Sequence, residues 1–272
     1  MSRRLNVIYI AGVARSGTSW FGQVFNSCPD VTFRFQPLFS YEFKGRVGED
    51  STDDEFQQFF RDLEATETPF LTQSDKIETG EYPRFIKNPT CSSLVFKENR
   101  YQSILLPMLR RTQNLRVLGL VRHPCAVLNS WRKNAKEFPP GSELAREWRF
   151  AACKNKGPED YFGYFKWKEV ANMYLDLQAQ FPERFMLVRY EDAVSQPTET
   201  FRKLFDFFGV PFGNQTQTFL EESTNKHGES YYGVYKNANV ADKWKDELDP
   251  YIVEQIRADL AGTRLEQFVA DN

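Results

Sequence analysis

Residues 9–25, YIAGVARSGTSWFGQVF, constrain the fold more than any other stretch of the chain. Residues 5–14 are apolar and rich in β-branched side chains, the turn that follows holds glycine, serine and threonine, and residues 16–27 have helical spacing. Buried parallel strands are typically such apolar runs. A turn between a strand and a helix directs backbone N–H groups and the positive end of the helix dipole into one concavity. The stretch therefore predicts a strand, an anion-binding turn and a helix.

The turn differs from the loop that binds ATP in one decisive position. A Walker-type loop reads G-x-x-x-x-G-K-[ST], and its lysine reaches the outer phosphates of a triphosphate. Gly12 and Gly17 fit this spacing, but Thr18 stands where the lysine should be. The later apolar run LRVLGLV ends in Arg122 rather than in an acid that would hold Mg²⁺. We therefore expect a nucleotide with a shorter phosphate chain and no obligatory metal ion, the alternative being a tight turn that binds nothing.

The side chains of the turn also suit an anion. Ser16, Thr18 and Ser19 offer hydroxyl donors, and Arg15 offers a guanidinium that can hold two oxygen atoms at once. The formal net charge of the 272-residue chain is −2, so no global field attracts nucleic acid or acidic lipid. The anion site must therefore be local.

Strand-like and helix-like segments alternate along the whole chain, which favours a parallel sheet with helices on both faces. Residues 67–92 and 210–240 are expected to be long loops over the sheet, and no repeat or linker divides the chain. We therefore predict an α/β fold, a P-loop-like parallel sheet flanked by helices, in a single domain over residues 1–272. The expected strands are 5–14, 31–35, 93–97, 115–122 and the start of 184–194, and the expected helices are 16–27, 49–66, 100–111 as far as Pro107, 124–135, 164–181, 197–209 and 249–262.

The cysteines bear on the compartment. They are scattered and form no C-x-x-C pair, which argues against a disulfide framework or a zinc site and fits a reducing compartment. The apolar run at the N-terminus is short and leads straight into the turn, so we interpret it as a strand rather than as a signal peptide. No stretch is long enough to span a bilayer. We expect a cytoplasmic protein whose four thiols are free: Cys28, Cys91, Cys125 and Cys153.

A second segment, VRHPCAVLNS, places Arg122 at the end of a strand and Ser130 eight residues later. Taken alone, such an arginine can equally form a surface ion pair. Together with ARSGTSW at 14–20, however, the segment resembles the sulfotransferases that use 3′-phosphoadenosine 5′-phosphosulfate (PAPS). VRYEDAVSQPTETFRKLFDFFGVPF is similar to a later segment of the same family. RSGTSWFGQVFNSCPDV is closest to its carbohydrate, Golgi-type branch, whereas Trp20 is more like the soluble small-molecule branch.

The resemblance implies how a donor would be held. In the family, the first loop binds the 5′-phosphosulfate, an aromatic residue after it packs on adenine, and the Arg–Ser pair holds the 3′-phosphate. It implies PAPS as donor, adenosine 3′,5′-bisphosphate (PAP) as product and no metal ion. PAPS carries one 5′-phosphate with a sulfuryl group, so its loop needs no lysine that reaches further out. The donor-binding residues implied here are Arg15, Ser16, Gly17, Thr18, Ser19, Trp20, Arg122, Ser130 and Lys236.

The residue that deprotonates the acceptor is the open question. The carbohydrate branch has a Glu-Pro step after the second strand, but this chain has Gln36 there, and an amide cannot take a proton. The soluble branch has a histidine after a lysine on a middle strand, where this chain has Lys97, Glu98 and Asn99. We predict that Glu98 is the base, that Lys97 donates to the bridging oxygen, and that Arg15 stabilises the charge that develops there. The alternative is that Lys97 and Glu98 are ordinary solvent-facing charges.

Other residues remain candidates for parts of the site. Glu42 and His227 are further candidates for the base, whereas His123 is expected to be structural. Lys236 lies in a basic, aromatic segment that relatives fold over the nucleotide, and it is expected at the 3′-phosphate or ribose unless it is simply solvated. The alternating aromatic residues of 33–43 fit either an acceptor wall or a half-buried strand.

Three functions follow from these observations. The main hypothesis is a sulfotransferase whose partner is a hydroxyl-bearing small molecule or glycan, with a sugar hydroxyl slightly ahead of an aryl or alkyl alcohol and with no role for nucleic acid. The second is a nucleotide kinase that has diverged from the Walker pattern, although the missing lysine and metal-binding acid weigh against it. The third is an inactive protein that keeps the nucleotide cradle, which Gln36 leaves open.

Overall fold

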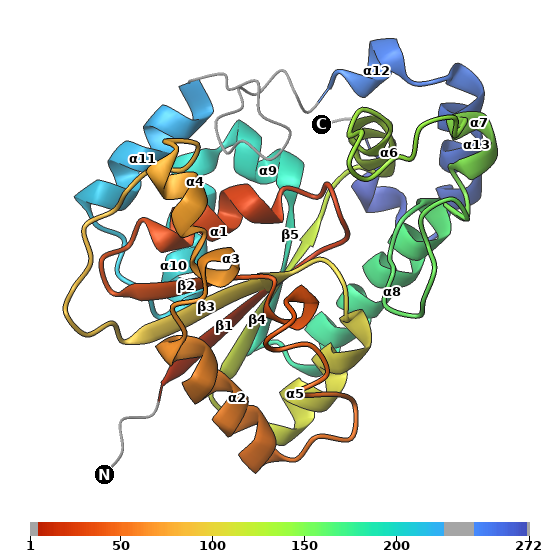
Figure 1. Ribbon diagram of the computed structural model, residues 1–272. Helices are drawn as coiled ribbons and strands as arrows, with labels where there is room; N and C mark the ends of the chain where they lie inside the picture. The colour runs from red at the N-terminus through yellow and green to blue at the C-terminus, as the bar shows by residue number, and fades with distance from the viewer. Residues whose placement is uncertain (1–4, 226–241, 271–272) are drawn as a thin grey trace.

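Five parallel strands in the order β2-β3-β1-β4-β5 form the centre of the protein (Figure 1). The computed structural model describes residues 5–225 and 242–270. The predicted parallel sheet flanked by helices is confirmed. The strands are β1 (Asn6–Ala11), β2 (Val31–Phe35), β3 (Ser93–Glu98), β4 (Leu115–Val121) and β5 (Phe185–Arg189).

Helices cover both faces of the sheet (Figure 1). On one face lie α1 (Thr18–Asn26), α9 (Tyr190–Ser195), α10 (Pro197–Phe208) and α11 (Asn214–Asn225). The other face carries α2 (Asp53–Ala65), α5 (Leu105–Arg111) and α8 (Tyr164–Gln180). Further from the sheet, α6 (Pro124–Arg132) packs on α8, and α13 (Pro250–Leu260) packs on α6. The short elements are η1 (Pro37–Phe39), α3 (Pro69–Thr72), α4 (Ser74–Glu78), η2 (Gln102–Ile104), α7 (Leu144–Glu147), α12 (Trp244–Glu247) and η4 (Glu266–Phe268).

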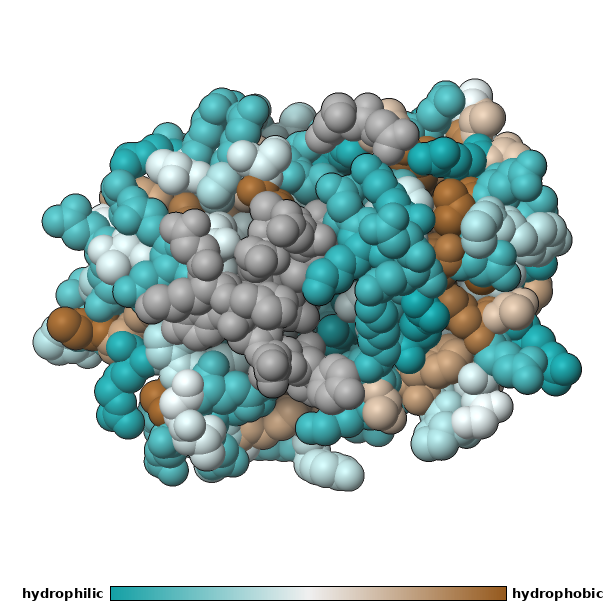
Figure 2. Space-filling view, turned by 90° about the horizontal axis from the view of Figure 1, so that it is seen from above, coloured by the Kyte–Doolittle hydropathy of each residue, from teal (hydrophilic) through white to brown (hydrophobic). Residues whose placement is uncertain are grey.

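Each strand buries alternate side chains on opposite faces of the sheet. On β1, Ile8 and Ile10 pack toward α1 and α10, whereas Val7 and Tyr9 pack toward α2, α5 and α8. Because successive residues of a strand point to opposite faces, Lys97 and Glu98, the last two residues of β3, also point to opposite faces of the sheet. The surface above these layers is mostly hydrophilic, with apolar residues showing in patches between the polar ones (Figure 2).

Two segments differ from the sequence prediction. Part of the loop expected at 210–240 is a helix, α11, because Thr216, Phe219, Leu220 and Ser223 recur at helical spacing and are buried. The loop expected at 67–92 contains the short helices α3 and α4. The many polar residues of 214–225 hide the periodicity in the sequence, so the helix is evident only from its buried face.

The helix at 100–111 also differs in detail. Pro107 does not disturb it, because α5 begins only at Leu105 and the proline falls within its first turn. The first N–H groups of a helix have no partner within the helix, so a residue without an N–H is tolerated there.

Candidate functional site

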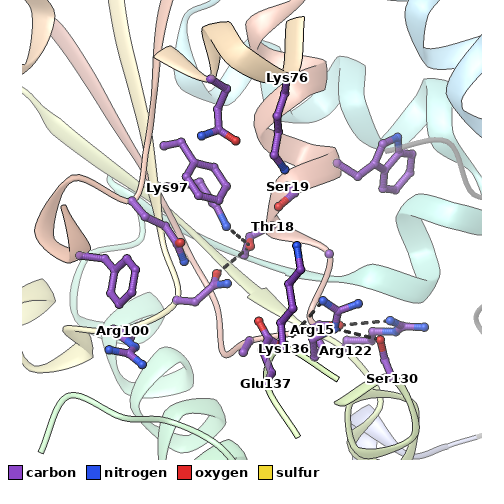
Figure 3. Close-up of a pocket in the computed structure, with 18 of the residues that line it drawn as sticks. Arg15, Thr18, Ser19, Lys76, Lys97, Arg100, Arg122, Ser130, Lys136 and Glu137 are labelled. Carbon is purple, nitrogen blue, oxygen red and sulfur yellow. Dashed lines mark hydrogen bonds and ion pairs between the residues drawn. The ribbon is translucent and has the colours of Figure 1, made fainter. Parts of the chain in front are cut away.

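A cavity of about 720 Å³ opens where β1, β3 and β4 end, next to the loop that precedes α1. Its walls come from this loop, from the end of β3, from η1, from α3 and α4, and from the chain that follows α6. Binding sites of open parallel sheets lie outside the carboxyl ends of the strands, which is where this cavity is. Figure 3 shows that basic side chains from several of these elements point into it.

The loop between β1 and α1 has the form of an anion cradle. Arg15 and Gly17 have positive φ angles, 72° and 97°. A Cβ atom on Gly17 would lie 2.5 Å from the ring of Tyr190, so only glycine fits. The hydroxyl of Ser16 is buried and has no hydrogen-bond partner among the described residues. A buried donor without a partner at the start of a helix fits an anionic group such as the 5′-phosphate of PAPS.

Three of the predicted donor-binding residues meet at one end of the cavity. Arg15 Nε donates to Ser130 Oγ at 3.1 Å, and Arg122 Nη1 donates to the backbone oxygen of Arg15, also at 3.1 Å. The guanidinium of Arg122 lies 4.6 Å from the centre of the Tyr190 ring. The sequence assigned Arg15 to the 5′ end of the donor and Ser130 to the 3′ end, whereas the structure shows the two side chains in direct contact (Figure 3).

Trp20 lines the cavity from the first turns of α1. Its indole N–H donates to Ser223 Oγ at 2.9 Å, and its ring makes edge contacts with Tyr190 and Phe201. These contacts hold the indole in one orientation beside the cradle. Its anchor, Ser223, belongs to α11, the helix that the sequence did not reveal.

Lys97 and Thr18 meet in the floor of the cavity. Lys97 Nζ donates to Thr18 Oγ1 at 3.4 Å, and Thr18 Oγ1 donates to Asn99 Oδ1 at 2.7 Å. The Lys97 side chain is 1% exposed, and its amine lies 4.3 Å from the centre of the Phe35 ring. Burial lowers the pKa of Lys97 to about 7, against the opposing influence of nearby negative charge. Lys97 is therefore not an ordinary solvent-facing charge.

Glu98 does not line the cavity. It follows Lys97 on β3 and points to the opposite face of the sheet, where Oε1 accepts a hydrogen bond of 2.6 Å from the N–H of Leu38. Burial raises the pKa of Glu98 to about 8, although this hydrogen bond and the charge of Lys97 oppose the shift. A base must lie within hydrogen-bond reach of the proton that it removes. The position of Glu98 therefore argues against the role of base that the sequence suggested.

The other candidate bases are Glu42 and His227. Glu42 is exposed and accepts hydrogen bonds from the hydroxyls of Thr66 and Thr68, away from the cavity. His227, like Lys236, lies outside the described residues. The roles predicted for these two residues stay predictions.

His123 is buried and stacks on Trp244, with ring centres 4.2 Å apart. Its Nδ1 accepts the N–H of Cys125 at the start of α6. Burial and nearby positive charges such as Arg257 lower the pKa of His123 to about 3. A neutral ring that caps a helix fits the structural role expected for it.

The aromatic residues of 33–43 contribute to the cavity in part. Phe35, Gln36 and Phe39 line it, and Gln36 has a φ of 43°, in the left-handed region. The amide of Gln36 is thus inside the site, where it can orient a hydroxyl but cannot deprotonate one.

Several polar residues that line the cavity were not singled out from the sequence. They lie in loops and short helices whose only common feature is charge, so no motif marks them. They include the basic residues Lys76, Arg100, Lys136 and Lys154 and the acidic residues Asp75, Glu81 and Glu137.

Within residues 5–225 and 242–270, no helix is long and apolar enough to cross a membrane. Among the same residues, no group of three or more histidine, cysteine or acidic side chains is placed to hold a metal ion.

Comparison with known proteins gives consistent results. A sequence profile described as "Sulfotransferase family" matches residues 7–214. The chain is 27% identical to carbohydrate sulfotransferase 4 of Mus musculus, over 67% of this chain and 50% of that protein. It is 24% identical to carbohydrate sulfotransferase 6 of Homo sapiens, over 91% of this chain and 76% of that protein. The chain thus spans half of the mouse relative.

Solved structures share the fold. The chain is similar to a mouse sulfotransferase, SULT7A1, complexed with PAP, with a TM-score of 0.55, 13% identity and coverage of 96% of this chain and 87% of that one. It is also similar to a sulfotransferase domain from the Synechococcus PCC 7002 olefin synthase, with a TM-score of 0.54, 19% identity and coverage of 99% and 97%. At these identities the likeness concerns the fold.

Proposed function

Since the chain belongs to the sulfotransferase family, we propose that it transfers a sulfuryl group from PAPS to a hydroxyl group, with a carbohydrate as the first candidate for the acceptor. The curated relatives reported above are named as carbohydrate sulfotransferases, which supports this choice. We also propose a cytoplasmic location, which rests on the scattered cysteines of the sequence.

The observation that carries the proposal is the arrangement of cationic and hydroxyl groups around one cavity. Arg122 and Ser130 lie on one side of Arg15, and the cradle with Thr18 and Lys97 lies on the other. A bisphosphate nucleotide has an anionic group at each end of its ribose. The Arg122 and Ser130 side chains would hold its 3′-phosphate, and the cradle would hold its 5′ end.

Lys97 has the chemistry needed at the reacting centre. Charge builds up on the oxygen of the departing phosphate, and a preorganised donor in a water-poor site stabilises such charge best. The buried amine of Lys97, hydrogen-bonded to Thr18 at the mouth of the cradle, is placed for this role. Arg15 would contribute positive charge beside the same phosphate.

An aryl or alkyl alcohol remains the second candidate for the acceptor. It is favoured by one feature, the aromatic wall of Phe35, Phe39 and Phe70, in which the ring centres of Phe35 and Phe70 lie 5.6 Å apart. Aromatic rings bind both apolar rings and the C–H faces of sugars, so this wall accommodates either class.

Binding of PAP tests the donor assignment directly. Replacing Arg122 with alanine is expected to weaken PAP much more than AMP in calorimetric titrations, because AMP lacks the 3′-phosphate. Arg132→Ala, at the end of α6, the helix that follows Arg122, and outside the cavity, is the matched control. Equal losses for the two nucleotides would remove Arg122 from the 3′-phosphate site. Transfer of radiolabelled sulfate from PAPS to sugars, phenols and aliphatic alcohols then identifies the acceptor class, and the absence of any transfer would contradict the proposed activity.

A further inference from the structure

A carboxylate lines a cavity that is otherwise built for anions. Glu137 belongs to the chain that follows α6, and its Oε2 lies 3.8 Å from Arg15 Nη1. Its side chain is only 17% exposed. A negative charge in this position repels an anionic donor and so weakens donor binding. A role in the reaction would explain why a carboxylate is present here.

The backbone of Glu137 is firmly held. Its N–H donates to the oxygen of Asn134 at 2.9 Å, and its own oxygen accepts the indole N–H of Trp131 at 3.2 Å. Asn134 and Trp131 are both buried. Figure 3 shows the side chains of Glu137 and Lys97 pointing into the same cavity from different elements. The negative charge of Glu137 is also among the influences that oppose the burial-driven fall in the pKa of Lys97.

The other polar groups near the reacting centre do not fit a base. Gln36 and Asn99 are amides, and Glu98 faces the opposite side of the sheet. Asp75 and Glu81 are the remaining carboxylates among the described residues that line the cavity. Asp75 is exposed, and Glu81 pairs with Lys76 of α4 at 3.4 Å. Glu137 is the carboxylate that contacts the phosphate loop itself.

We propose that Glu137 is the general base that accepts the proton of the acceptor hydroxyl. The proposal rests on the function proposed above. A bond forms between the acceptor oxygen and sulfur, and the bond between sulfur and the bridging oxygen breaks. The acceptor proton passes to the Glu137 carboxylate, and the electron pair of the broken bond stays on the 5′-phosphate oxygen, to which Lys97 donates.

Arg15 links the base to the donor. The structure shows its guanidinium between Ser130 and Glu137, with charge attraction to the carboxylate. An anionic donor competes for the same guanidinium, and Glu137 is then available to the acceptor. The charged groups near Glu137 in this arrangement are Arg15, Lys97 and Lys136, the residue that precedes Glu137 in the chain.

The test compares Glu137→Gln with the matched control Glu81→Gln, which removes an equal charge from the same cavity. PAP binding is measured by calorimetry, and PAP release from PAPS is measured with aliphatic alcohols and sugars, with 4-nitrophenol in mildly alkaline solution, and with water alone. Loss of a general base lowers rates by about 10²–10⁴-fold. We expect Glu137→Gln to lose about that much with alcohols and water, while its PAP affinity stays equal to or better than that of the wild type.

The acidity of the acceptor separates a base from a merely structural residue. Ionised 4-nitrophenol has no proton to give up, so Glu137→Gln should lose far less activity with it than with an alcohol. An equal loss with both acceptors, or a fall in PAP affinity that matches the fall in turnover, would overturn the assignment. Unchanged turnover with alcohols would overturn it as well. Failure of the wild-type protein to bind PAP would instead refute the proposed function, and the base assignment with it.

Discussion

Lys97 should take up a proton when a nucleotide phosphate binds beside it. Burial lowers the pKa of this lysine to about 7, so near pH 8 only about one tenth of the free protein carries the charge. A phosphate dianion within hydrogen-bond reach favours the charged form and moves the pKa back toward the ordinary value of lysine. Binding of PAP near pH 8 should therefore take up about 0.9 proton, and near pH 6, where the amine is already charged, only about 0.1.

Calorimetric titrations in buffers of different ionisation enthalpy measure this proton uptake directly. The phosphates of PAP are fully ionised near pH 8, so they contribute little there. Glu98, whose pKa is raised to about 8 by burial, can also take up a proton, and it remains in the variant Lys97→Met. The charge of Lys97 also affects the pKa of Glu98, so the comparison is made near pH 8 between Glu98→Gln and the double variant Lys97→Met/Glu98→Gln, whose difference reports Lys97. An observed heat that does not depend on the buffer, or an uptake by the double variant as large as that of Glu98→Gln, would refute the reasoning.

The same lowered pKa affects stability. Between about pH 7 and the ordinary lysine value of 10.5, the unfolded chain binds more protons at this site than the folded protein, so the free energy of unfolding rises with pH. About 1.4 kcal/mol per pKa unit over about 3.5 units gives a range on the order of 5 kcal/mol. Urea unfolding of Lys97→Met should be flatter across this window, and the variant should be more stable than the wild type near neutral pH.

Two further predictions test the cradle and the buried carboxyl group. Gly17→Ala places a Cβ atom 2.5 Å from the Tyr190 ring at a φ of 97°. We therefore expect the free energy of unfolding, measured by thermal denaturation, to fall by about 1–3 kcal/mol, and added PAP to give no stabilisation. A variant that binds PAP normally would contradict the role of this loop as an anion cradle. The pKa of Glu98 is raised to about 8 from 4.5, so its contribution to stability is complete below about pH 4.5 and is lost as the pH rises to about 8. Glu98→Gln keeps an acceptor for Leu38, so it should remove this decline in denaturation measured at several pH values while sulfate transfer persists; abolished transfer with intact folding would return the base role to Glu98.

The sequence predicted the parts of the site that depend on local order along the chain. The strand, turn and helix around Arg15 form one continuous segment, and its conformation follows from the residues within it. Arg122 and Ser130 likewise lie eight residues apart, at the end of β4 and on α6. The parallel sheet brings this segment and the segment around Arg15 to the same edge. Neither segment by itself shows that β1 and β4 are neighbours in the sheet. The general rules of parallel sheets were nevertheless enough to predict that their carboxyl ends lie at the same edge.

The remainder depended on tertiary packing. The anchor of Trp20 lies on α11, a helix whose polar sequence conceals its buried face. Glu137 comes from a short stretch of chain that is held by hydrogen bonds with the backbone oxygen of Asn134 and with the indole N–H of Trp131, and no local sequence pattern predicts that placement. The orientation of Glu98 away from the cavity, in contrast, could have been predicted from the sequence. Once Lys97 is assigned to the cavity, the alternation of a strand turns the next residue away from it.

Because of this alternation, Lys97 and Glu98 make their contacts on opposite faces of the sheet. Lys97 brings a charge to the cavity face, where its amine meets Thr18. On the opposite face, the Glu98 carboxyl group holds the N–H of Leu38 in η1, while the backbone oxygen of Lys97 accepts the N–H of Gln36. The end of β3 thereby fixes the turn that carries Gln36 and Phe39 into the cavity. A carboxyl group that does not line the cavity thus helps to hold the turn whose left-handed residue, Gln36, forms part of the cavity wall.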